Sequence, residues 1–115
     1  MRYLLLIATD EDVAAALGDD ERAAMTAEYL AFSEELRRRG VLLGSDRLRP
    51  TSDATTVRVR DGEVLVADGP FAETKEQVGG YYLVDCGDLD EAIEVAAAVP
   101  GARHGTVEVR PIWDP

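Results

Sequence analysis

The chain has very few of the residues on which disulfides, zinc sites and histidine chemistry depend. Its 115 residues include one cysteine, Cys86, and one histidine, His104. A single cysteine cannot form an internal disulfide, which fits a reducing compartment, and it excludes a cysteine-rich zinc site. Because Cys86 follows an apolar run, we expect a buried structural thiol and not a nucleophile.

Basic residues are also scarce, since 12 lysines and arginines face 23 acidic residues and give a net charge of −11. This charge repels phosphate backbones and anionic lipids, so we expect neither a nucleic acid nor a membrane surface as partner. The first apolar run, residues 3–8, is too short to span a bilayer and lacks the cleavage region of a signal peptide. A cytoplasmic protein is the expectation.

Several motifs of catalysis and cofactor binding are missing. There is no glycine-rich phosphate loop, no serine–histidine–aspartate signature and no cluster with the spacing of metal ligands. We therefore expect no metal site and no bound cofactor.

What is present is enough for one domain covering residues 1–115, because 46% of the residues are hydrophobic. The continuous apolar runs 3–8 and 81–84 predict two central strands that are covered on both faces. Residues 41–44 predict another strand, and residues 106–112 predict a last strand at an edge, because it carries Pro111.

Two segments predict amphipathic helices. Between Gly18 and Gly40, an apolar stripe with spacings of four, three and four residues is formed by Met25, Tyr29, Phe32 and Leu36. A shorter helix is expected to begin after Asp88, with Glu91 completing a capping box, and to end at Pro100. Its predicted apolar face comprises Leu89, Ala92, Ile93, Ala96 and Val99.

Residues 55–60 and 63–67 alternate around Asp61-Gly62, which predicts a β-hairpin with a type I′ turn. If Arg60 faces Glu63, then Val59 faces Val64, and the valines of both strands share one face. Arg58 lies on the other face, where we interpret it either as a solvated side chain or as a contact for an anionic ligand.

The order of these elements predicts an α+β protein: a ferredoxin-like sandwich of a mostly antiparallel sheet with two main helices on one face. Two helices cover only one face, yet runs 3–8 and 81–84 are apolar on both sides. A second copy of the chain is the simplest cover for the open face, so we expect a homodimer through that face.

One long stretch, residues 68–82 (the connecting segment), resembles neither a strand nor a helix over most of its length. Asp68, Gly69 and Pro70 favour a turn, and Phe71 is expected to be buried and to anchor the loop. Gly79 and Gly80 should allow a bend or a close approach before a strand that begins at Tyr81. We interpret the segment either as a rigid connector or as a loop that faces a ligand.

The run Asp68-Gly69-Pro70-Phe71, followed by residues 72–77, resembles the signature of the DGPF-domain branch of the YCII-related proteins. The resemblance continues through residues 3–7, the Asp61-Gly62 turn and residues 105–112, so it covers nearly the whole chain. It implies a dimeric α/β-barrel arrangement in which two sheets pack face to face, with small-molecule clefts beside them. It also implies a histidine–aspartate pair, and an association with sigma factors of the extracytoplasmic-function type.

Two functions from different classes follow. One is a small cofactor-free enzyme, an isomerase or lyase, with Asp68 and His104 as acid–base candidates, because histidine exchanges a proton near neutrality. The other is a non-catalytic dimeric module that binds a small ligand or a regulatory protein such as a sigma factor, for which an acidic surface suits a basic partner. The candidate ligand-binding residues are Arg58, Phe71, Lys75 and Tyr81.

Overall fold

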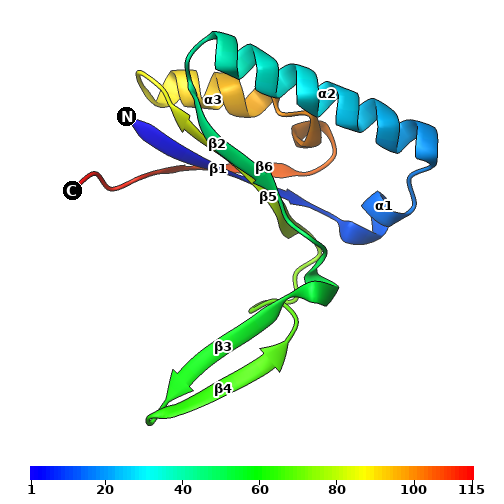
Figure 1. Cartoon of the computed structure of the whole chain (residues 1–115), viewed down its shortest axis with the longest axis vertical. Coiled ribbons are helices and arrows are strands. Elements are labelled where there is room, and N and C mark those ends of the chain that lie inside the picture. The colour runs from blue at the N-terminus through cyan, green and yellow to red at the C-terminus, as the bar shows by residue number, and fades with distance from the viewer.

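The computed structural model describes residues 1–115, which form a four-stranded antiparallel sheet, helices on one face of it and a separate two-stranded hairpin (Figure 1). The elements in chain order are β1 (Arg2–Thr9), α1 (Glu11–Ala15), α2 (Asp19–Arg38), β2 (Leu42–Arg47), the 3-10 turn η1 (Thr51–Asp53), β3 (Thr55–Arg60), β4 (Glu63–Asp68), β5 (Gln77–Asp85), α3 (Leu89–Ala98), the 3-10 turn η2 (Pro100–Arg103) and β6 (Thr106–Pro111). The predicted α+β, ferredoxin-like sandwich is confirmed. A single chain closes no barrel.

The four-stranded sheet has the order β2-β5-β1-β6, so β1 and β5 are the two central strands, as predicted. Alternation along β1 turns Tyr3, Leu5 and Ile7 towards the helices, where they are buried. From β5, Tyr82 and Val84 join the same core. The other face of the sheet carries Leu4, Leu6 and Leu83, which no helix covers.

The helices that cover the sheet follow the apolar periodicity only in part. In α2 three of the four residues of the predicted stripe are confirmed, because Leu36 is buried and Tyr29 and Phe32 pack against the core, whereas Met25 is only partly buried. In α3 the buried positions are Ala92, Val95 and Ala96, and Val99, directly after the helix, is buried as well. The prediction that Leu89 and Ile93 belong to this face was wrong, since their side chains are 48% and 50% exposed. The buried residues lie three, four and seven positions after Ala92, and this spacing places Leu89 and Ile93 at the edge of the apolar face. None of the helices is long and apolar enough to cross a bilayer.

The hairpin β3–β4 has the predicted register, with Arg60 opposite Glu63, and Val59 and Val57 opposite Val64 and Val66. Asp61 and Gly62 both have positive φ angles, 51° and 78°, as a type I′ turn requires. The hairpin is nevertheless a sheet of its own. It projects on the side of the four-stranded sheet opposite α2 and α3 (Figure 1).

Two strands are longer than predicted. β5 begins at Gln77 and not at Tyr81, so Gly79 and Gly80 lie within the strand. A β-bulge accommodates them: Ile7 pairs with Gly80 and Ala8 with Val78, which leaves Gly79 without a partner in β1. β2 continues to Arg47 and pairs closely with β5, since a Cβ on Gly80 would lie only 3.1 Å from the carbonyl oxygen of Asp46.

Candidate functional site

A cleft of about 290 Å³ lies between α1, η1 and the connecting segment. Apart from one proline, every lining residue is polar or charged, and the set is Asp10, Glu11, Asp12, Thr51, Pro70, Glu73, Thr74, Lys75 and Gln77. Five of the nine belong to the connecting segment. The segment therefore faces a cleft.

One wall of the cleft is held together by carboxylates that already have partners. The side chain of Asp10 caps α1 by accepting hydrogen bonds from the backbone N–H groups of Asp12 (3.0 Å) and Val13 (3.5 Å). The carboxylate of Glu11 accepts hydrogen bonds from the hydroxyl of Thr51 and from its backbone N–H (2.8 Å). Both bonds lower the pKa of Glu11, and the bond from the hydroxyl contributes most. Both carboxylates are thus part of the frame of the site.

The opposite wall is ordered by polar groups of the connecting segment itself. The amide Nε2 of Gln77 donates to the carbonyl oxygens of Ala72 (2.9 Å) and Thr74 (3.3 Å). The hydroxyl of Thr106, in β6, donates to the carboxylate of Glu76 at 2.7 Å. The connecting segment is therefore fastened both to itself and to the last strand.

Phe71 does not anchor this loop, because its side chain is 84% exposed. The prediction that the phenyl ring is buried within the chain was wrong. The hydrogen bonds that the side-chain amide of Gln77 donates hold the loop instead, and they do not involve the phenyl ring.

Three charged groups of the cleft have no hydrogen bond or ion pair within the chain: the carboxylates of Asp12 and Glu73 and the ammonium of Lys75. In total the cleft holds four carboxylates and one ammonium group, so its field is negative. This arrangement can bind a small molecule through a cationic amine, and Lys75 can pair with an anionic group of the same molecule.

The two acid–base candidates lie on different elements and do not contact each other. Asp68 is the exposed last residue of β4, opposite Thr55 in the hairpin. His104 is exposed and directly follows η2. No hydrogen bond or ion pair joins the two side chains, although the bond between Thr106 and Glu76 brings the connecting segment to a residue two positions from His104.

Of the four predicted ligand-binding residues, only Lys75 lines the cleft. Tyr81 lies on the open face of the sheet, where its hydroxyl donates to Asp46 at 2.7 Å, and this hydrogen bond raises the pKa of the phenol. Arg58 is an exposed side chain of the hairpin without an acidic partner, and Phe71 is exposed. The structure does not bring these four side chains together.

Sequence reasoning did not include Asp12 and Glu73 among the candidate residues. The contact between Glu11 and Thr51 joins positions 40 residues apart, which no local pattern indicates. One signal was available: three consecutive acidic residues, 10–12, directly follow a buried strand, where a helix cap needs only one of them.

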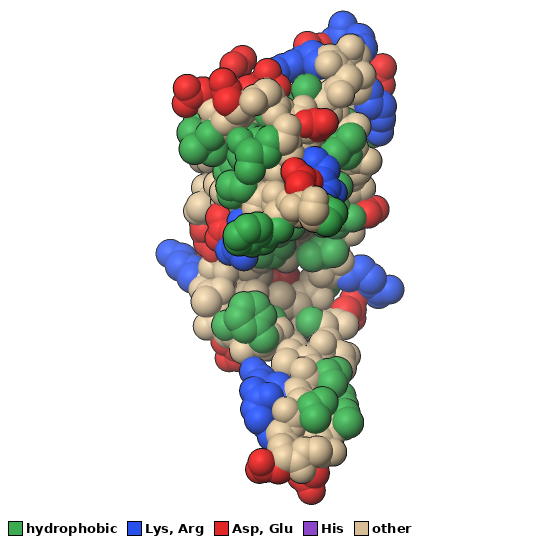
Figure 2. All heavy atoms as spheres, turned by 90° about the vertical axis from the view of Figure 1, so that its left-hand side faces the viewer, with side chains coloured by type: hydrophobic (Ala, Val, Ile, Leu, Met, Phe, Trp, Pro, Cys, Tyr) green, Lys and Arg blue, Asp and Glu red, His purple; other side chains and the backbone are tan.

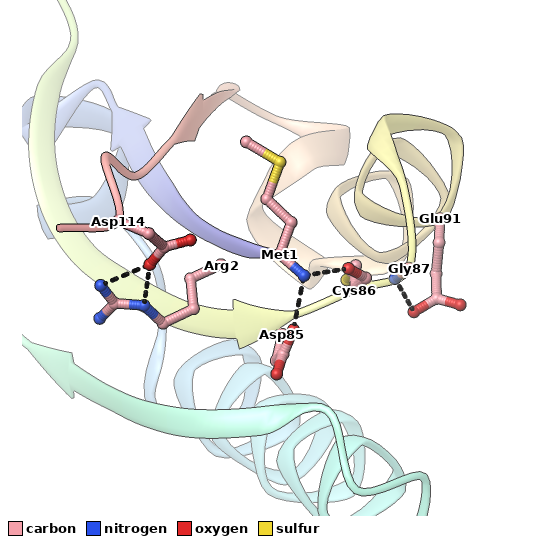
Figure 3. Close-up of polar contacts among 7 residues, drawn as sticks. All are labelled: Met1, Arg2, Asp85, Cys86, Gly87, Glu91 and Asp114. Carbon is pink, nitrogen blue, oxygen red and sulfur yellow. Dashed lines mark hydrogen bonds and ion pairs between the residues drawn. The ribbon is translucent and has the colours of Figure 1, made fainter.

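Cys86 has the structural role predicted for it. It is 2% exposed, and burial, followed by the neighbouring Glu91, raises the pKa of its thiol to about 11. Its carbonyl oxygen accepts a hydrogen bond from the amine of Met1 at 2.9 Å, and the same amine pairs with Asp85 (Figure 3). Nearby, Arg2 pairs with Asp114. These contacts tie the first strand to the end of β5 and contain no reactive thiolate.

Comparison with known proteins gives two matches. The chain matches the family model described as the YCII-related domain over residues 1–114. It is also 41% identical, over 114 residues, to an uncharacterised protein of Rhizobium meliloti (strain 1021). That match covers 97% of this chain and 92% of the relative, and the name of the relative assigns it no activity.

Proposed function

The chain belongs to the YCII-related domain family, and we propose that this member binds a small, amine-bearing molecule in the cleft between α1 and the connecting segment. The observation that carries the proposal is the set of unpaired charges, Asp12, Glu73 and Lys75, in one polar cleft. Its volume of about 290 Å³ is at the lower end for ligand sites, which favours a molecule of the size of an amino acid.

The charges also indicate where each end of such a ligand would lie. An ammonium group gains charge-assisted hydrogen bonds from Asp12 and Glu73, whereas Lys75 repels it. A carboxylate on the same ligand is attracted by Lys75. A zwitterion therefore uses all three groups, and a simple anion uses only one.

The proposal is tested by measuring binding of three matched probes, L-alanine, L-alaninamide and L-lactate, by isothermal titration calorimetry and by NMR. The amino acid and its amide should bind, and lactate should not. Glu73→Gln should weaken both amines about tenfold or more, because a hydrogen bond to a charged group contributes about 1.5–3 kcal/mol. Lys75→Met should weaken alanine and leave alaninamide unchanged or tighter.

Glu94→Gln is the matched control, since Glu94 is an exposed glutamate of α3 outside the cleft. It should leave the affinity of every probe unchanged. Binding of lactate equal to that of alanine, or equal effects of Glu73→Gln and Glu94→Gln, would overturn the proposal.

The open sheet face supports a second part of the proposal, that the protein acts as a homodimer. Leu4, Leu6 and Leu83 are partly exposed on this face, and both long helices cover the other. Burying apolar area contributes about 25 cal/mol per Å² before the costs of association. Sedimentation should show a dimer, and Leu83→Lys should dissociate it; a monomer at millimolar protein would contradict this part.

Acid–base catalysis by Asp68 and His104 is the second candidate function, and the bond between Thr106 and Glu76 is the observation in its favour. NMR of the His104 ring decides it. If the pair works together, Asp68→Asn shifts the ring-proton signals of His104. Unchanged ring signals leave ligand binding, or binding of a basic regulatory protein such as a sigma factor, as the function.

A further inference from the structure

The β3–β4 hairpin has almost no contact with the rest of the chain. Every residue of β4 is exposed, and in β3 only Thr56 is partly buried, by a bond from its hydroxyl to the carbonyl oxygen of Gly69. An isolated two-stranded hairpin is at best marginally stable in water and needs another surface to pack on. The hairpin of this chain lacks such a surface.

The two faces of the hairpin differ in chemistry. One face carries four β-branched side chains, each 58–65% exposed: Val57, Val59, Val64 and Val66. We call it the valine face. The opposite face carries Arg58 and Arg60 near the turn. Figure 2 shows the hydrophobic side chains along one side of the projecting hairpin and the basic side chains along the other.

We propose that the hairpin is a dimerisation arm whose valine face packs on a second copy of the chain. This inference does not depend on the proposed ligand site, and it rests on the homodimer proposed above. The arm projects on the same side as the uncovered sheet face, so it is continuous with the surface proposed to meet the second copy (Figure 1). A copy resting on that sheet lies within reach of the arm.

The area that a stable dimer needs also favours the arm. The strands β1, β5, β2 and β6 have 8, 9, 6 and 6 residues, so one face of the sheet covers roughly 450 Å² at the usual strand spacing and rise per residue. A standard interface buries about 800 Å² on each partner. The open sheet face alone falls short, and the valine faces of the two exchanged arms supply additional area.

A second copy is a better occupant than an unrelated protein for two reasons. Four adjacent exposed valines promote aggregation whenever they are uncovered, the more so because both strands of the hairpin are edge strands. Another copy of the chain is always present to cover them. In addition, each chain carries a net charge of −11, so two copies repel each other. Residues 57–66 of the arm carry no net charge, because Arg58 and Arg60 offset Asp61 and Glu63, so the arm approaches the acidic partner with less repulsion than the rest of the surface.

The direct test is an isotope-filtered NOESY experiment on a dimer reassembled from one copy with ¹³C-labelled valine and leucine methyl groups and one unlabelled copy. Methyl groups of the valine face should show contacts with protons of the unlabelled copy. A dimer in which only the methyl groups of Leu4, Leu6 and Leu83 show such contacts would overturn the arm and keep the sheet-face dimer. A monomeric protein would overturn both.

Substitutions in the hairpin give a second test. The rest of the protein should stay folded even if the hairpin is disturbed, because the four-stranded sheet has its own core. Val64→Lys combined with Val66→Lys should raise the dissociation constant of the dimer at least about 100-fold in analytical ultracentrifugation. Leu65→Lys, an apolar-to-lysine change on the opposite face, is the matched control and should change it less than about threefold. Equal effects of the two variants would overturn the orientation of the arm, and no effect of either would overturn the arm itself.

Discussion

Individual polar side chains in this protein are either satisfied by the fold or left free in the cleft. No buried side-chain nitrogen or oxygen lacks a hydrogen bond. Ser33 and Tyr82 bond to each other at 2.7 Å in the core, and the hydroxyl of Tyr29 accepts the N–H of Gly101 at 3.0 Å. The unpaired charges of Asp12, Glu73 and Lys75 are therefore available for a ligand without any cost to the core.

The thiol of Cys86 should make the stability depend on pH in the alkaline range. Its native pKa, raised from 9.0 to about 11, means that between these values the unfolded state loses the proton while the native state keeps it. The free energy of unfolding therefore falls as the pH rises from 9 to 11, by up to about 2–3 kcal/mol from this group. In urea unfolding, the free energy of unfolding should decrease less between pH 8 and pH 11 in Cys86→Ala than in the unsubstituted protein. An equal decrease in both proteins would contradict the assignment.

Gly105 should be intolerant of a side chain. A Cβ there would overlap the carbonyl oxygen of Ala8 and lie 2.9 Å from a methyl group of Thr9. We expect Gly105→Ala to lower the free energy of unfolding by about 1–3 kcal/mol, because the backbone of β1 cannot move away. Gly87→Ala, where a Cβ meets nothing within 4 Å, is the control and should cost less than about 1 kcal/mol in the same urea titration.

Among the elements, the short helix α1 matters most for the site, because Glu11 fastens it to η1. Thr51→Val removes the hydroxyl that contributes most to lowering the pKa of Glu11. The pKa of Glu11 should then rise towards its ordinary value, as measured by NMR titration of its carboxyl carbon. Because a lowered carboxyl pKa stabilises the native state only above that pKa, the variant should lose stability at neutral pH and not in acid.

A feature of the fold could be predicted from the sequence where residues close together in the chain determine it, and not where tertiary contacts do. The register of β3–β4 follows from alternation and from Asp61-Gly62, which are neighbours in sequence, so it was predicted in full. The start of β5 was missed because Gly79-Gly80 is typical of a loop, and only the pairing with β1 makes it a bulge. The exposure of Phe71 and the contact of Glu11 with Thr51 depend on tertiary structure, which the pattern along the chain does not contain.

At the scale of the whole molecule, the acidic net charge opposes the association of two copies, whereas the projecting hairpin is proposed to favour it. Two chains of charge −11 repel at long range, whereas the apolar contacts of the sheet face and of the valine face act only at short range. Salt weakens the charge repulsion and does not weaken the apolar contacts. A higher ionic strength should therefore favour the dimer.

Raising the sodium chloride concentration from about 20 mM to about 300 mM shortens the Debye length from roughly 20 Å to roughly 6 Å. We expect the dissociation constant of the dimer to fall several-fold over this range in sedimentation equilibrium. A dissociation constant that increases with salt would show that ion pairs, and not apolar contacts, hold the two copies together.

The measurement that tests the ligand site most directly is a ¹H–¹⁵N NMR titration of the labelled protein with L-alaninamide, which maps where the amine binds. We expect the backbone signals that move to belong to residues 10–12, Thr51 and residues 71–77, and we expect Glu73→Gln to suppress these shifts while Glu94→Gln does not. Shifts confined to the open sheet face or to the surroundings of His104, or no shifts at all, would contradict it.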